Sequence, residues 1–203
     1  SEILRTCKVS RTVLDHNAGD KREEFRLRDT QTGLDITCEV RTFDEFPAVD
    51  WVLHITNRGA KDTPIIENLQ VADCAFARDA NGGEFVLRRS RGSQSEMLDF
   101  ATADEKLGPS ESRVYGGLVG RSSCGTLPFM NLAWDTRGVV VAVGWSGEWQ
   151  TTFQRDATNG MRVLAGMKDV RLKLHPGESI RTPRILLLFW DGENMYRGHN
   201  LFR

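Results

Sequence analysis

Apolar and polar residues alternate with a period of two along most of this chain, and this pattern restricts the fold more than any other feature of the sequence. The alternation is clearest in residues 34–41, 49–56 and 170–175. Successive side chains of a β-strand point to opposite faces of a sheet, so the pattern predicts strands with one buried face. Val139–Val143 and Ile185–Trp190 are instead continuously apolar, which predicts central strands covered on both faces.

Turn signals separate these segments at short intervals, as in Asn81-Gly82-Gly83. Together they predict an all-β fold, a large antiparallel β-sandwich of about 12 strands. Ser90–Glu111 lacks the alternation and is predicted to be a long excursion with one strand. Glu193–Arg203 is the best helical candidate, a short C-terminal helix with Asp191 as its cap. No repeat or linker-like stretch occurs, so residues 1–203 are expected to form a single domain.

The charge balance and the apolar runs exclude two classes of partner. Lys and Arg number 27 against 28 Asp and Glu, for a formal net charge of −1. This balance gives no electrostatic reason to expect nucleic acid or an anionic membrane as a partner. The longest apolar runs are also far shorter than the roughly 20 residues that a membrane-spanning helix needs. We therefore expect neither a nucleic-acid partner nor a membrane partner.

The cysteine pattern gives no indication of a metal site. No C-x-x-C pair occurs, and no cysteine has a histidine at ligand spacing, so no metal is predicted. Reduced thiols are favoured because a chain of this length does not need cross-links, although disulfides stay an alternative. No Asn-x-Ser/Thr sequon occurs, and a cytoplasmic location is expected. The four cysteines are Cys7, Cys38, Cys74 and Cys124.

Motifs for catalysis or nucleotide binding are missing. Gly116–Gly120 is glycine-rich but lacks the G-x-G-x-x-G spacing, and a tightly packed strand is the preferred interpretation. Ser122 has Cys124 where a nucleophile elbow needs its second glycine. No two histidines lie at metal-ligand spacing, and they are predicted to be surface or strand-end residues. Neither a catalytic residue nor a cofactor is predicted.

Two tryptophans form the feature with the clearest chemical meaning. Trp145 and Trp149 lie four residues apart in a glycine-flanked turn, and Asp156 follows nearby. Flat aromatic faces beside carboxylates suit sugar rings, whose C–H faces stack while their hydroxyl groups form hydrogen bonds. Trp145, Trp149 and Asp156 are therefore the candidate substrate-binding residues. The alternative is that both indoles fill a corner of the sandwich core. The other three tryptophans, Trp51, Trp134 and Trp190, are predicted core residues.

Three ordered segments resemble a known family. Together they cover most of residues 30–189, and no single one of them is diagnostic. In this order, they resemble the N-terminal β-supersandwich domain of glycoside hydrolase family 36, the α-galactosidase group. The segments are Phe46–Asn57 with Thr63–Asn68, Leu127–Leu132 running on to Gly144–Trp149, and Pro176–Glu178 with Arg181–Phe189.

The resemblance implies a galactose-mutarotase-like supersandwich that precedes a (β/α)8 barrel. In such enzymes the barrel carries the two catalytic aspartates of a retaining mechanism. Its motifs are absent from these 203 residues, so no catalytic aspartate is carried over and the chain alone is expected to be inactive. The end at Asn200–Arg203 is similar to the point where the barrel would begin, and it fits an excised domain or a split chain at least as well as a complete protein.

The resemblance also implies partners and a role for the candidate residues. The domain would pack against the catalytic barrel and help to complete a galactoside cleft in its own or a neighbouring subunit, with Trp145 and Trp149 in that cleft and Asp156 behind them. The family often forms oligomers. Two alternatives stay open at this point: a free-standing carbohydrate-binding sandwich, and a purely structural or assembly domain.

Overall fold

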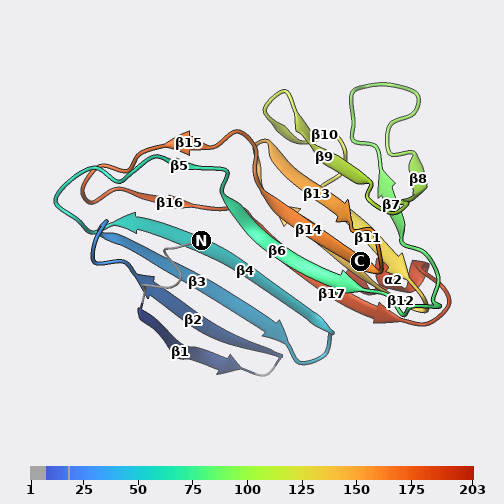
Figure 1. The fold of residues 1–203 in the computed structure, drawn as a ribbon, viewed down its shortest axis with the longest axis horizontal. Coiled ribbons are helices and arrows are strands. Elements are labelled where there is room, and N and C mark those ends of the chain that lie inside the picture. Colours follow the sequence, from blue (N-terminus) through green and yellow to red (C-terminus); the bar gives the residue numbers. More distant parts are fainter. Residues whose placement is uncertain (1–7, 18) are drawn as a thin grey trace.

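A computed structural model describes residues 8–17 and 19–203, and every strand pairing in them is antiparallel. The largest sheet has ten strands, and its middle is formed by the two continuously apolar segments (Figure 1). Its strand order is β1 (Lys8–Asn17), β2 (Asp20–Arg28), β3 (Leu34–Phe43), β4 (Ala48–Asn57), β17 (Arg184–Asp191), β12 (Arg137–Gly144), β11 (Phe129–Trp134), β7 (Val86–Ser90) and β8 (Thr102–Lys106), with β16 (Ser179–Arg181) also paired to β4.

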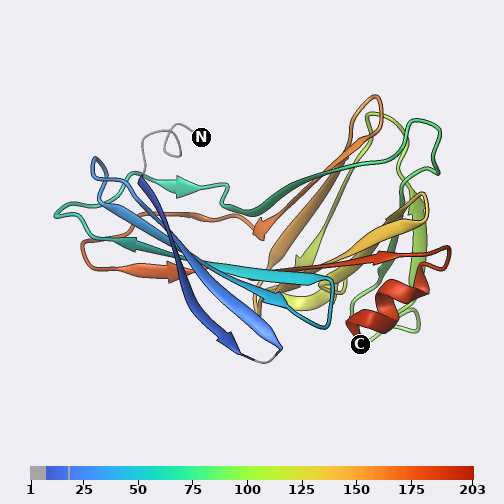
Figure 2. The same ribbon diagram turned by 90° about the horizontal axis from the view of Figure 1, so that it is seen from below.

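A second sheet of five strands covers one half of the large sheet (Figures 1 and 2). The main core lies between the two sheets. Beyond the second sheet, β1, β2 and β3 extend the large sheet to one side (Figure 1), and a two-stranded ribbon packs against residues of β3, β4 and β16. The second sheet has the order β10 (Arg121–Gly125), β9 (Ser112–Leu118), β13 (Trp149–Arg155), β14 (Gly160–Met167) and β6 (Gln70–Ala77), and the ribbon pairs β15 (Arg171–Leu172) with β5 (Ile66–Glu67).

The central strands confirm the prediction made from their continuous apolar sequence. In β12, Val139 and Val141 face the core between the sheets, whereas Val140 faces a separate apolar cluster on the other side. All three side chains are fully buried. β17 pairs with β12 along its whole length and is covered in the same way.

A short C-terminal helix, α2 (Tyr196–Phe202), provides the cover on that other side. The helix was predicted, but the cap assigned to it was wrong. Asp191 is the last residue of β17, and the N-cap position is Met195, which forms no side-chain capping hydrogen bond. The side chain of Asn194 accepts a hydrogen bond from the backbone N–H of Tyr196 at 2.9 Å. The buried Trp190 donates from Nε1 to Asn131 Oδ1, and Asn131 Nδ2 donates to the carbonyl of Met195, both at 2.8 Å. This relay fixes the start of the helix to the sheet.

The structure has 17 strands in its described residues, more than the dozen expected. The additional strands are short, and segments of two to five residues are too short to display an alternation. The predicted strand over residues 170–175 shrinks to Arg171–Leu172, because Leu174 exchanges hydrogen bonds with Thr63 instead of continuing the ladder. The single strand predicted within Ser90–Glu111 is confirmed as β8.

The outer strand β1 is irregular. Its pairing with β2 shifts register between Val13 and Asp15, so that Leu14 forms a bulge. Leu14 and Val13 are both exposed.

Cys38, Cys74 and Cys124 are free thiols, and Cys7 lies outside the described residues. Burial raises the pKa of the Cys38 thiol to about 11, with a smaller contribution from Glu39. Within residues 8–17 and 19–203, no helix is long and apolar enough to cross a membrane. The same part of the chain contains no group of three or more His, Cys, Asp or Glu side chains arranged to hold a metal ion.

The packing of α2 on Trp190 leads to a stability prediction. A Cβ atom on Gly198 would lie 2.5 Å from Cδ1 and 2.6 Å from Nε1 of that indole. Gly198→Ala should therefore lower the free energy of unfolding by about 1–3 kcal/mol, although alanine ordinarily favours a helix over glycine by about 1 kcal/mol. Asn200→Ala, at an exposed position of the same helix, is the control and should be neutral or stabilising. Urea unfolding measures both variants, and a stabilised Gly198→Ala protein would contradict the packing.

Candidate functional site

Trp149 begins β13 and is completely buried between the two sheets. Its Nε1 donates to the carbonyl of Ser122 at 2.7 Å, so its polar atom is also satisfied within the protein. The backbone of β9 passes so close that a Cβ on Gly116 would lie 2.4 Å from the Trp149 carbonyl oxygen. Trp149 has no free ring face for a ligand, and the core role that the sequence left as an alternative is the one it takes here.

Trp145 lies in the turn before β13 and remains half-buried, with one side packed against the main core. Gly147 follows in the same turn, and a Cβ there would approach the Trp145 Nε1 to 3.1 Å. The absence of a side chain at Gly147 therefore leaves the nitrogen edge of the indole open. Of the two candidate tryptophans, Trp145 alone keeps surface that a ligand or partner can reach.

Glu148 ties this turn to the neighbouring β9–β10 hairpin. Its Oε1 accepts a hydrogen bond from the N–H of Gly120 at 2.7 Å, and its Oε2 accepts one from Lys168 Nζ at 2.8 Å. Lys168 and, after it, the Gly120 amide hold the pKa of Glu148 below its usual value. Val119, at the tip of the hairpin, has a φ of 48°, a strained conformation for a β-branched residue, and is 71% exposed.

Asp156 lies at the opposite end of β13 from the tryptophans. The seven residues of that strand span roughly 20 Å. The Asp156 carboxylate accepts hydrogen bonds from the backbone N–H groups of Gly160 and Thr158 and from Arg155, and these contacts, in that order, lower its pKa. It caps the β13–β14 turn. The structure thus does not bring the three predicted site residues together.

A small cavity of about 170 Å³ lies below the tryptophan turn, between β9 and β13. Tyr115 lines it, and burial, followed by the hydrogen bond to Glu105, raises the pKa of this tyrosine to about 12. The hydroxyl is therefore neutral at physiological pH and is already engaged as a donor to Glu105. Nothing in this cavity supplies an acid and base pair.

A larger cavity of about 370 Å³, which no sequence motif indicated, lies where β11 and β17 end and β12 begins. The ladder places Trp134, Arg137 and Asp191 opposite one another on three adjacent strands, with Phe189 beside them. Arg137 is paired to Asp79 at 2.9 Å. The strand register could have predicted this grouping, but pairing across distant strands is not visible in a single sequence. Trp134 and Trp190 are core residues as predicted, and Trp51 is half-buried against the core.

The different burial of the two tryptophans can be tested by unfolding. Trp149→Ala should lower the free energy of unfolding by about 3–5 kcal/mol, because it leaves a large cavity in the core. Trp145→Ala should cost about 1–2 kcal/mol, since only part of that side chain is removed from water. Denaturant unfolding followed by circular dichroism measures both, and equal losses would contradict the assignment of one residue to the core and the other to its edge.

The Glu148 tether predicts an acid-dependent loss of stability. The pKa of this carboxyl is lowered in the folded chain, so its contribution is complete above the usual value of 4.5 and is lost as the pH falls through the folded pKa. Glu148→Gln should therefore reduce stability at neutral pH and flatten its decline in acid. Glu45→Gln, in the exposed β3–β4 turn, is the control. Unfolding curves at several pH values would refute the tether if both variants kept the parent's acid profile.

Comparisons with known proteins give a result for structure only. No family model matches the sequence, and no curated protein does. The galactosidase domain of the α-galactosidase–sucrose kinase AgaSK superposes with a TM-score of 0.72 and 21% identity, covering 89% of this chain and 25% of that one. The GH36 α-galactosidase AgaA from Geobacillus stearothermophilus superposes with a TM-score of 0.71 and 17% identity, covering 92% of this chain and 27% of that one. The α-galactosidase from Lactobacillus brevis superposes with a TM-score of 0.74 and 15% identity, covering 91% of this chain and 26% of that one.

The chain spans about a quarter of the length of the solved structures it matches. At these identities the likeness concerns the fold, and it confirms the all-β supersandwich expected from the three ordered segments. The protein has the fold of the N-terminal domain of the glycoside hydrolase family 36 α-galactosidases.

Proposed function

We propose that this chain is the N-terminal, non-catalytic domain of an α-galactosidase-type glycoside hydrolase and that it packs against a (β/α)8 catalytic domain. The supporting observation is the match to three α-galactosidase structures over about nine-tenths of this chain and a quarter of theirs. The remaining three quarters of such an enzyme would hold the chemistry. The parent enzyme would be a retaining hydrolase that acts on galactosides.

The carboxylates of this chain support a non-catalytic role. A retaining glycosidase needs two carboxyl groups about 5–5.5 Å apart across an open cleft. In the described residues, two of the carboxylates beside cavities, Glu23 and Asp191, lie near basic side chains. Glu23 accepts hydrogen bonds from Arg11 and lies 3.0 Å from Lys21, and Asp191 lies 3.4 Å from Arg197. Such groups act as structural ion pairs.

Exposed apolar side chains support a docking surface at one end of the sandwich. The loop between β7 and β8 presents Met97, Leu98 and Phe100 to solvent, and Met97 is fully exposed. The loop is nonetheless ordered, because Asp99 accepts hydrogen bonds from the Gln94 amide and from two nearby serines. Large apolar side chains held on an ordered loop are typical of a surface that another protein covers.

The β9–β10 hairpin extends this apolar surface. The backbone after β7 is hydrogen-bonded to β10, from Gly92 to Gly125 and from Ser93 to Ser123, so the loop and the hairpin lie together (Figure 1). The hairpin adds Val119, whose neighbour Gly120 is tied to the turn that carries Trp145. We propose that this surface meets the catalytic domain and that Trp145 borders the substrate cleft. Trp149 and Asp156 have no part in it.

The docking proposal is tested with the 203-residue chain and the barrel encoded next to it, expressed separately. Phe100→Asp should weaken their association by at least about tenfold. Aspartate tolerates the left-handed backbone at this position, where φ is 63°, so the variant should fold. Phe46→Asp makes the same change at a similarly exposed phenylalanine in the β3–β4 turn and should leave association intact. Equal weakening of the association by the two variants would contradict the assignment of the docking surface to the β7–β8 loop.

The wider proposal depends on what the gene encodes and on activity. The coding sequence should continue past Arg203 into a barrel, and the 203-residue chain alone should not hydrolyse an aryl α-galactoside. A reading frame that does not encode a barrel would refute the proposal of an α-galactosidase-type parent enzyme. Hydrolysis of the galactoside by the 203-residue chain alone would refute the non-catalytic role. The alternative, a free-standing carbohydrate-binding module, rests on the cavity beside Phe189 and Trp134. Quenching of tryptophan fluorescence by galactose would favour it.

A further inference from the structure

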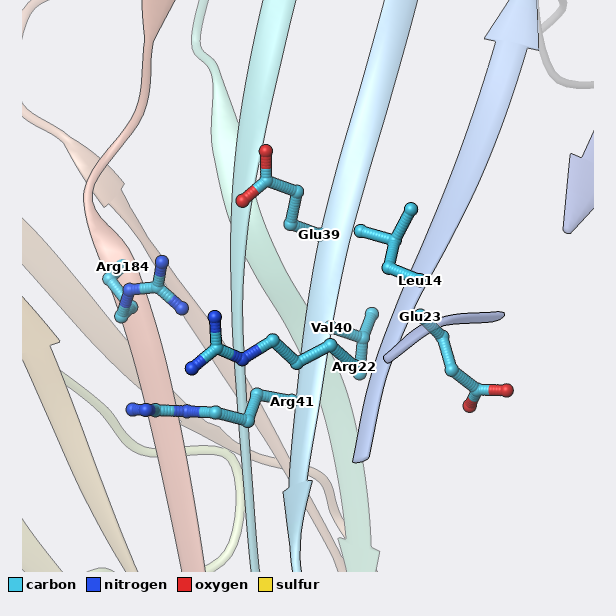
Figure 3. A pocket seen from close by; sticks show the side chains of 7 residues that line it. All are labelled: Leu14, Arg22, Glu23, Glu39, Val40, Arg41 and Arg184. Atoms are coloured by element: carbon cyan, nitrogen blue, oxygen red, sulfur yellow. The ribbon is translucent and has the colours of Figure 1, made fainter. Parts of the chain in front are cut away.

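Three arginines line a polar pocket of about 240 Å³ on the part of the large sheet that extends beyond the second sheet. Figure 3 shows the guanidinium groups of Arg22, Arg41 and Arg184 directed toward one another from β2, β3 and β17. Leu14, in the bulge of β1, closes one side. Arg184 pairs with Gly144, the residue directly before the turn that carries Trp145.

Strand register explains why these side chains meet. Arg22 pairs directly with Arg41, and Arg41 pairs directly with Asp50 of β4, so all three lie on one face of the sheet. Asp50 pairs in turn with Leu186, and Arg184 lies two residues before Leu186 on the same face. Two arginines directly opposite each other repel, which makes the arrangement unfavourable unless a negative charge offsets it.

Asp50 holds two of the arginines in place. Its side chain is 1% exposed, and its Oδ2 accepts hydrogen bonds from Nε and Nη2 of Arg41 at 3.1 and 2.7 Å. Its other oxygen, Oδ1, accepts a hydrogen bond from Arg184. The guanidinium of Arg41 also stacks on the ring of Phe43, 4.5 Å from the ring centroid. These contacts fix the direction of both guanidinium groups before any ligand arrives.

Other acidic groups lie around the cluster. Asp20 Oδ2 lies 3.5 Å from Nη2 of Arg22 and 3.8 Å from Nη1 of Arg41. Two carboxylates, Asp20 and Asp50, thus face three guanidinium groups. Of the two glutamates at the rim, Glu39 lies 3.6 Å from Nε2 of His54, and Glu23, which points away in Figure 3, lies 3.0 Å from Nζ of Lys21. Glu39 thus adds a third negative charge beside the three guanidinium groups, because His54 is charged only when it is protonated.

The three guanidinium groups have unused hydrogen-bond donors. Each guanidinium has five N–H donors, and the bonds to Asp50 use two from Arg41 and one from Arg184. The closest approach of Arg22 to a carboxylate, 3.5 Å, is an ion pair without a short hydrogen bond. Its side chain is half exposed, at 53%, and reaches across the pocket. Donors in fork geometry are suited to the planar or tetrahedral oxygens of an oxyanion.

We propose that this pocket binds the oxyanion group of a small molecule, a phosphate or a carboxylate, between Arg22, Arg41 and Arg184. The anion accepts hydrogen bonds from the free guanidinium N–H groups. Asp50 acts as a positioning residue, because it orients Arg41 and Arg184 without facing the ligand. The site does not depend on the proposed catalytic partner, since all its groups come from this chain.

The test is a calorimetric titration of the 203-residue chain with inorganic phosphate and, separately, with citrate, at pH 7 and with ionic strength held constant by KCl. Calorimetry is preferred to thermal shift because phosphate stabilises folded proteins generally by exclusion from their surface. Saturable binding of phosphate alone identifies a phosphate site, and saturable binding of citrate alone identifies a carboxylate site. The absence of saturable binding of either anion at millimolar concentration overturns the proposal.

A pair of arginine variants separates the pocket from general charge. Arg22→Gln should weaken anion binding by at least about tenfold and should fold normally, because Arg22 does not hold the buried Asp50. Arg26→Gln removes the same charge from the same face of β2, outside the pocket, where Arg26 is one of three arginines around Asp35. It should leave the affinity unchanged. Equal weakening by both variants would show a nonspecific charge effect and would also overturn the site.

Discussion

The pairing of β12 with β17 is the contact on which the rest of the fold depends. Both strands are apolar on both faces, so neither face can be left in contact with water, and the pair requires a covering layer on each side. The five-stranded sheet provides one layer, and α2 with the segment before it provides the other. The long, polar remainder of the large sheet is attached to this centre through β4, which pairs with β17.

The sequence was sufficient for the parts of the fold where burial and periodicity agree. Alternation located β3 and β4, and the continuous apolar runs located the two central strands. Strands of two or three residues could not be predicted from the sequence, because their pairing is decided by neighbours that are distant in the chain. The prediction of Trp149 as a substrate-binding residue failed for a different reason. It shares its parity with the buried Thr151 and Phe153, so extending the alternation through β13 would have assigned it to the core.

The candidate site required knowledge of register as well as pattern. Asp156 is close to the tryptophans in sequence, yet an extended strand separates them, and hydrogen bonds within its own turn occupy its carboxylate. Arg22, Arg41 and Arg184 are the opposite case, distant in sequence and close in space. They are scattered over more than 160 positions of the sequence, and three successive strand pairings bring them to one point. A single sequence records neighbours along the chain, whereas sites in a sheet are built across it.

The bulge in β1 has a consequence for how copies of this protein meet one another. A regular outer strand offers a row of unpaired N–H and C=O groups to which a strand of another molecule can add. The register shift at Leu14 breaks that row. At the other edge of the sheet, Asp104, Glu105 and Lys106 place charges along β8. Both margins of the ten-stranded sheet are thereby protected against growth into a continuous intermolecular sheet, which protects an extended β-protein from aggregation.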